Sequence, residues 1–171
     1  MRTLDADARS LCRMQALVFE RSVQLQCASA VFIRRFMNSN VALRMDGGGF
    51  LSESNSPEGI LTEVEGQYGK STYGSVTFSA EELHWMGYLY RYWVCLFEKP
   101  SAAVYKIIGA NELRGLYFAY HSLDPEQAIC RIAESKEVVL EEDDLARGVA
   151  ALRRIRAKRP QSLISYEVTR F

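Results

Sequence analysis

The chain has 171 residues, with 21 basic and 21 acidic side chains, so its formal net charge is zero. This length suits one domain with room for an appendage. The neutral balance gives no general attraction to nucleic acid or to an acidic membrane surface. The N-terminus, MRTLDADARSL, lacks the apolar segment of a signal peptide, so we expect a cytoplasmic protein.

The four cysteines, Cys12, Cys27, Cys95 and Cys130, are widely spaced and lie within apolar helical patterns. They are predicted to be reduced core thiols. Because none forms a CxxC pair, a zinc site is not expected.

Three helices are predicted in the first third of the chain. The first covers Asp5 to Gln26, the second begins with Ser29 as its cap, and a short third covers Val41 to Met45. Gly47 to Gly49 then follow without the spacing of a phosphate-binding loop, so they indicate the end of a helix.

A fourth helix is predicted to start at Ser56-Pro57 and run to about Gln67. The loop from Tyr68 to Gly74 contains two tyrosines, which we expect to pack against the helix that follows.

That following helix, Ala80 to Glu98, is the predicted centre of the fold. Ser79 and Glu82 have the spacing of a capping box, and Pro100 requires the helix to end before it. Apolar residues surround the helix, which is typical of a buried one. The residues expected to be mostly buried are Met86, Leu89, Tyr90, Trp93 and Phe97.

Three shorter helices are predicted after Pro100, capped by Ser101, Asn111 and Asp124. Asp124-Pro125 is the clearest of these starts, because proline is favoured at the first helical position.

The C-terminal part differs from the rest. Glu141 to Lys158 reads as an amphipathic helix with acids at its start and bases at its end, and Leu163 to Phe171 alternates like a strand. The predicted fold is therefore mainly α. About seven helices in residues 1–136 surround a central buried helix, and residues 137–171 form a C-terminal helix and a short strand-like tail that act as an arm.

Few residues point to catalysis. His121 is close to Ser122 and Asp124, but neighbours in a chain rarely align as a triad, so His121 is predicted to bond a nearby backbone group or the Asp124 cap. The two histidines lack a paired carboxylate motif, and neither a metal nor another cofactor is predicted. An enzyme of unknown class, with His121, Asp124 and Arg91 around a pocket, remains an alternative.

Arg91 lies in the middle of the central helix and needs a partner, because an unpaired buried charge is costly. The expected partner is Glu63, Glu65 or Glu112.

The first alternative, ahead of an enzyme, is a nucleic-acid-binding regulator. Its contacts would come from basic residues in a possible helix-turn-helix and at the end of the C-terminal helix. These residues are Arg34, Arg35, Arg44, Arg153, Arg154 and Arg156.

Several segments of the chain carry a resemblance to known proteins: 32–39, 68–71, 85–88, 90–93, 113–117, 120–124 and 127–129. They resemble a group of small bacterial proteins encoded in toxin–antitoxin-type or mobile-element gene neighbourhoods. The resemblance brings no catalytic residues with it and does not extend beyond about Lys136. It implies a non-enzymatic, antitoxin-like protein that binds and neutralises a partner encoded nearby. The residues predicted to contact that partner are Arg91, Tyr92, Arg114, Tyr120, His121, Ile164, Tyr166 and Val168.

Overall fold

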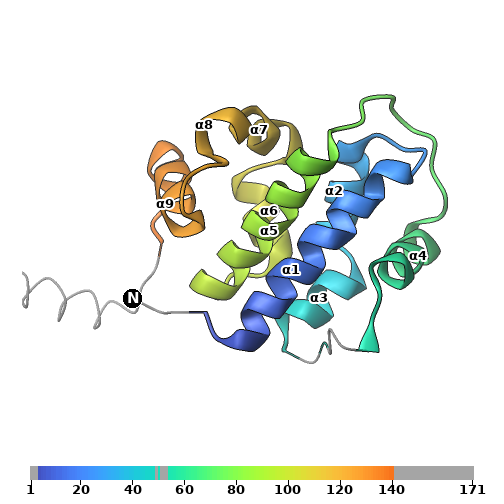
Figure 1. The fold of residues 1–171 in the computed structure, drawn as a ribbon, viewed down its shortest axis with the longest axis horizontal. Helices are drawn as coiled ribbons and strands as arrows, with labels where there is room; N and C mark the ends of the chain where they lie inside the picture. The colour runs from blue at the N-terminus through green and yellow to red at the C-terminus, as the bar shows by residue number, and fades with distance from the viewer. Residues whose placement is uncertain (1–3, 49, 51–53, 141–171) are drawn as a thin grey trace, which may run out of the picture. The chain divides into compact units, whose positions relative to one another are not determined.

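Helices α1 and α5 form the centre of the computed structural model, which describes residues 4–48, 50 and 54–140 (Figure 1). Helix α5 (Ala80–Phe97) begins with the predicted capping box: Ser79 Oγ accepts from the N–H of Glu82, and Glu82 accepts from the N–H of Ser79. Helix α1 (Ala6–Arg21) starts after Asp5, whose carboxylate accepts from the N–H of Ala8.

The other helices cover this pair on several sides. They are α2 (Ser29–Met37), α3 (Asn40–Asp46), α4 (Pro57–Tyr68), α6 (Ser101–Ile107), α7 (Ala110–Gly115), α8 (Tyr117–Tyr120) and α9 (Pro125–Ser135), with a short 3₁₀ turn, Ser22–Gln24, after α1. Seven of the nine α-helices have seven or more residues, and the described chain contains no strand. The mainly α prediction is confirmed for this part of the protein. The expected helix from Glu141 to Lys158 and the tail from Leu163 lie outside the described residues.

Helices α1 and α5 approach closely because α5 carries a glycine at their crossing. A Cβ atom on Gly87 would lie 2.7 Å from the carbonyl oxygen of Gln15 and 3.0 Å from Cα of Ala16. The contact pairs show that the two helices run antiparallel, since Glu20 meets His84 while Gln15 meets Arg91. This pairing buries Met86, Leu89, Tyr90 and Trp93 as predicted, whereas Phe97 is only half-buried.

Two predicted caps are wrong because tertiary bonds use their hydroxyls. Ser29 is the first residue of α2, and its Oγ accepts from the N–H of Phe78. Ser101 is the first residue of α6, and its Oγ donates to Asp46. The predicted Asn111 cap is also wrong, since α7 begins after Gly109 and includes Asn111.

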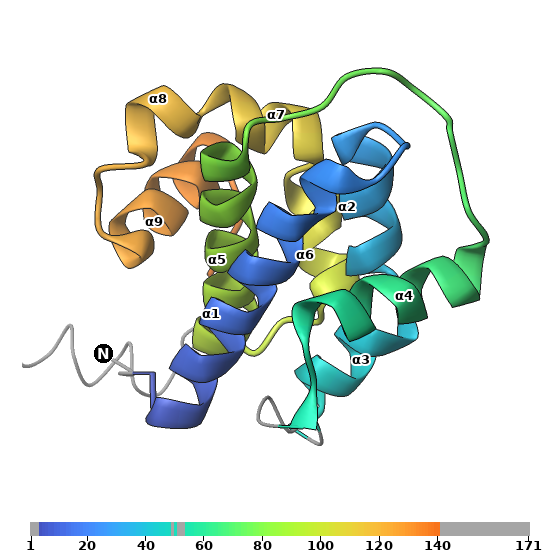
Figure 2. The same cartoon turned by 45° about the vertical axis from the view of Figure 1, so that its right-hand side comes forward.

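The loop from α4 to α5 does not pack its tyrosines on α5 as predicted. It runs past α2 (Figure 2), and the N–H groups of Ala28 and Ser29 donate to the carbonyls of Tyr73 and Val76. Tyr68 donates to the carbonyl of Asn38, and Tyr73 is 76% exposed. The start of α2 therefore gains hydrogen-bond partners from the loop instead of from a side-chain cap.

None of the described helices combines the length and the hydropathy that crossing a membrane requires.

Candidate functional site

Arg91 is fully buried and is the centre of a polar network inside the helical core. Its Nη1 donates to Asp46 Oδ1 at 2.6 Å, its Nε to Gln15 Oε1 at 2.8 Å and its Nη2 to Ser101 Oγ at 3.0 Å. The prediction that a glutamate pairs with Arg91 is wrong. Arg91 instead joins α5 to α1, α3 and α6, and its burial leaves no guanidinium surface for a partner protein.

The prediction failed because the nearby glutamates are used elsewhere. Glu63 makes a bidentate pair with Arg44, with N–O distances of 2.6 and 2.8 Å. Glu112 pairs with Lys136. Asp46 is the last residue of α3, just before Gly47 and Gly48. The packing of α3 beside α5 brings its carboxylate to Arg91.

Asp46 also completes the start of α6. Its Oδ2 accepts from the N–H of Ser101 at 2.8 Å, and its Oδ1 accepts from the Ser101 hydroxyl at 2.6 Å. One carboxylate therefore caps a helix in another part of the chain while it neutralises the buried Arg91.

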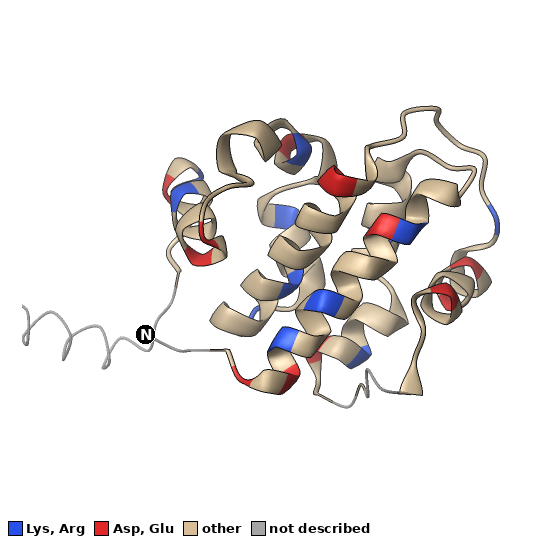
Figure 3. Ribbon diagram, in the orientation of Figure 1, with Lys and Arg blue, Asp and Glu red and all other residues tan. Residues whose placement is uncertain are grey.

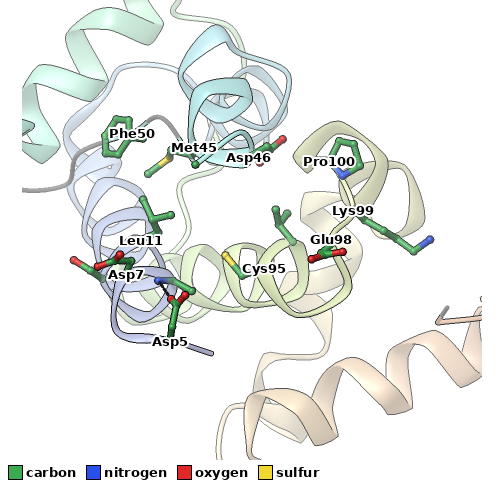
Figure 4. Close-up of a pocket in the computed structure, with 14 residues that line it drawn as sticks. Asp5, Asp7, Leu11, Met45, Asp46, Phe50, Cys95, Glu98, Lys99 and Pro100 are labelled. Atoms are coloured by element: carbon green, nitrogen blue, oxygen red, sulfur yellow. Dashed lines mark hydrogen bonds between the residues drawn. The ribbon is translucent and has the colours of Figure 1, made fainter. Parts of the chain in front are cut away.

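A cavity of about 800 Å³ lies next to this network. Figure 4 shows that its wall comes from the start of α1, the end of α3 and the end of α5 with the turn after it. Asp5, Asp7, Asp46 and Glu98 contribute carboxylates, and Lys99 contributes an ammonium. This excess of acidic groups favours neutral or cationic molecules over anions. No local sequence pattern marks this cavity, because its walls come from segments that are distant in the chain.

A second surface is aromatic, and it includes His121, one of the residues predicted to bind a partner. We define the aromatic face as Trp85 of α5, Tyr117 and Phe118 of α8, and His121. Tyr120, also predicted to bind a partner, is the last residue of α8 and is half-buried. Ring centroids are 5.6 Å apart for Trp85 and Tyr117 and 5.5 Å apart for Tyr117 and Phe118. Phe118 is 83% exposed, so much of this aromatic area is in contact with water.

His121 has the backbone bond that was predicted for it. Its Nδ1 lies 2.9 Å from the carbonyl oxygen of Tyr117, and its ring stacks on Tyr117 with centroids 4.7 Å apart. Asp124 caps α9 by accepting from the N–H of Glu126. Arg91 is fully buried and bonds neither residue, whereas His121 and Asp124 are exposed, so the structure does not bring the three together.

The other predicted partner contacts fall in different places. Tyr92 is half-buried against Tyr88, with ring centroids 6.1 Å apart. Burial, followed by the charges of Asp124 and Glu126, raises the pKa of Tyr92. Arg114 donates to Glu82 at 3.1 Å and lies over the ring of Phe78 at 4.5 Å, so it fixes α7 to the start of α5. Ile164, Tyr166 and Val168 lie outside the described residues.

The candidate nucleic-acid contacts are partly occupied by bonds within the protein. Arg44 is held by Glu63, and Arg35 donates to the carbonyl of Gly69 and lies over the ring of Tyr68. Basic and acidic positions are both spread over the helices (Figure 3). Arg34 is exposed, and Arg153, Arg154 and Arg156 lie outside the described residues.

Among the residues that the structure describes, no group of three His, Cys, Asp or Glu side chains is arranged to hold a metal ion. Comparison of the chain with protein-family models, with curated proteins and with solved structures finds no match to any of them.

Proposed function

We propose that this protein is an antitoxin-like interaction protein, which binds and neutralises a partner protein through its aromatic face. The exposure of Phe118 at 83%, next to Tyr117 and Trp85, is the observation that carries the proposal. Aromatic side chains are enriched in the buried centres of protein interfaces, and they supply large contact areas at little cost in conformational entropy.

The aromatic face is already ordered without a partner. Helix α8 is fixed by the stacking of His121 on Tyr117 and by the edge contact of Tyr117 with Trp85. A preformed surface binds more tightly than one that must be ordered on binding. Phe118 therefore provides the expected central contact, and the residues around it hold it in place.

The chemistry near the face defines the kind of partner. Aromatic rings attract apolar groups and the cationic heads of Lys and Arg. Asp124, three positions after His121, and Glu126 in the first turn of α9 add negative charge at this end of the face. The partner surface that fits has an apolar centre and a basic border.

Co-expression with the product of the adjacent gene tests this proposal. We expect the two proteins to copurify and the growth defect caused by the partner alone to disappear. Phe118→Ser should weaken binding by about tenfold or more, since a central aromatic contact contributes roughly 2 kcal/mol or more. Leu43→Ser is the matched control, because Leu43 is a 67% exposed apolar residue on α3, away from the aromatic face.

The proposal is wrong if the adjacent gene is harmless and its product does not copurify. Equal loss of binding in the Phe118→Ser and Leu43→Ser proteins would also contradict it, because the aromatic face would then have no special role.

A further inference from the structure

Cys12 of α1 and Cys95 of α5 face each other across the central helix pair. The contacts along this pair fix the register: Glu20 meets His84, Ala16 meets Gly87 and Gln15 meets Arg91. The helices are antiparallel, so moving one turn back along α1 corresponds to moving one turn forward along α5. One turn beyond the pairs Ala16–Gly87 and Gln15–Arg91, Cys12 therefore lies opposite Cys95. The mutual effect of the two thiols on their pKa values agrees with this register, because each acts on the other through a hydrogen bond between the side chains.

The two sulfur atoms differ in their electrostatic environment. Cys12 donates this hydrogen bond, which together with burial raises the pKa of the Cys12 thiol. The same bond lowers the pKa of Cys95, and the nearby Arg91 guanidinium lowers it further. Burial and the carboxylates of Asp46 and Asp5 act in the opposite direction, but the pKa remains below its ordinary value. Cys95 is therefore the thiol with the greater thiolate character, and thiolates are the nucleophilic form of cysteine.

The two sulfur atoms also differ in access. Cys12 is fully buried, whereas Cys95 is half-buried and lines the cavity beside Asp46 (Figure 4). A small molecule in the cavity reaches Cys95 first. The carboxylates of Asp5, Asp7 and Glu98 disfavour anionic reagents such as glutathione, so the reagent that fits is small and neutral.

We propose that Cys95 is a hydroperoxide-reactive thiol and that Cys12 is its resolving partner. In the first step the Cys95 thiolate attacks one oxygen of hydrogen peroxide and the O–O bond breaks. The hydroxide that leaves takes a proton from solvent and becomes water. Cys95 becomes a sulfenic acid, oxidised by two electrons, and the peroxide is reduced. In the second step the Cys12 sulfur attacks the Cys95 sulfur, an S–S bond forms, and the Cys12 proton leaves with the displaced hydroxyl as water.

The product is a disulfide that links α1 to α5 next to the Arg91 network. The link joins the two helices that form the centre of the fold, and thiol reductants reverse it. This modification site is independent of the aromatic face, so its test does not depend on the proposed partner.

Alkylation of the folded protein with iodoacetamide, followed by peptide mass spectrometry, tests the reactivity of each thiol. We expect Cys95 to react about tenfold or more faster than Cys130, which is also half-buried. Iodoacetate, the anionic analogue, should show a smaller preference for Cys95, because the acidic cavity repels it. Equal rates at Cys95 and Cys130 would overturn the proposal.

Treatment with hydrogen peroxide tests the resolving step. The wild-type protein should yield a Cys12–Cys95 disulfide within one chain, and Cys130→Ser, the matched control, should yield the same product. In Cys12→Ala, Cys95 should stop at the sulfenic acid, which dimedone traps. If the wild-type protein accumulates sulfenic acid at Cys95, or forms a different disulfide, Cys12 is not the resolving thiol. The wild-type measurement needs no variant, so it decides the question even if Cys12→Ala folds poorly.

Discussion

The guanidinium of Arg91 and the carboxylate of Asp46 meet at 2.6 Å, with the Arg91 side chain fully buried and the Asp46 side chain 13% exposed. Removing one member of such a pair leaves the other as an uncompensated buried charge. The pair therefore contributes to the stability of the packing among α3, α5 and α6.

Arg91→Met is expected to lower the free energy of unfolding by about 3–5 kcal/mol, because Asp46 would lose its cation. Urea denaturation at neutral pH measures the change. Arg44→Met is the matched control: it breaks the exposed pair with Glu63 and should cost about 1 kcal/mol or less. Adding Asp46→Asn to Arg91→Met should recover part of the loss, and a further large loss would contradict this account of the pair.

Gly87→Ala should destabilise the protein because its Cβ would meet backbone atoms of α1, at 2.7 Å from the Gln15 carbonyl oxygen. Overpacking of this kind costs about 1–3 kcal/mol. Gly66, inside α4, is the matched control, since a Cβ there meets nothing within 4 Å. Gly66→Ala should stabilise the protein by about 0.5–1 kcal/mol. Thermal melts of the two variants should shift in opposite directions, and equal shifts would show that α1 and α5 are not in close contact.

Trp93 is fully buried, and within the described residues its Nε1 has no hydrogen-bond partner. Trp93→Ala should cost about 3–5 kcal/mol through lost burial and a new cavity. Trp93→Phe should cost much less, since it keeps most of the ring and removes an unsatisfied donor. Denaturation curves for both variants check this difference, and similar losses would indicate that Nε1 bonds a partner.

Glu82 should make stability depend on acid pH. Burial alone would raise the pKa of Glu82, but hydrogen bonds from the Ser79 N–H and from Arg114 outweigh it, so the pKa lies below its ordinary value. The unfolded chain then takes up the proton at a higher pH than the folded chain does. The stability that Glu82 contributes is therefore present at neutral pH and is lost as pH falls below about 4.3 toward the folded pKa.

Glu82→Gln keeps a side chain that suits the capping box but removes the charge. The variant should be less stable than the wild type at pH 7, and the difference should shrink as the pH falls through the acid range. Glu81→Gln, on the exposed side of the same turn, should show a smaller difference. Parallel urea curves at several pH values make the comparison, and a Glu82→Gln difference that is constant with pH would contradict the assignment.

The helices with local start signals could be predicted from the sequence. Ser56-Pro57, the Ser79 and Glu82 capping box and Asp124-Pro125 are all helix starts in the structure. Each signal depends on hydrogen bonds between residues two or three positions apart, which any path of the rest of the chain permits. The burial of the central helix also followed from its composition, because a helix that is apolar all round must be covered.

The pairing of polar groups depends on the three-dimensional arrangement of the helices. Arg91 bonds Asp46 and Gln15, which precede it by 45 and 76 positions, and the sequence offered nearer glutamates that pair elsewhere. Serine is a favoured helix cap, but the hydroxyls of Ser29 and Ser101 form hydrogen bonds with Phe78 and Asp46 instead. A buried donor or acceptor takes the partner that the folded chain brings within about 3 Å, and no local pattern encodes that distance. For the same reason no local pattern predicts the cavity or the Cys12–Cys95 pair, because both depend on the packing of α1, α3 and α5.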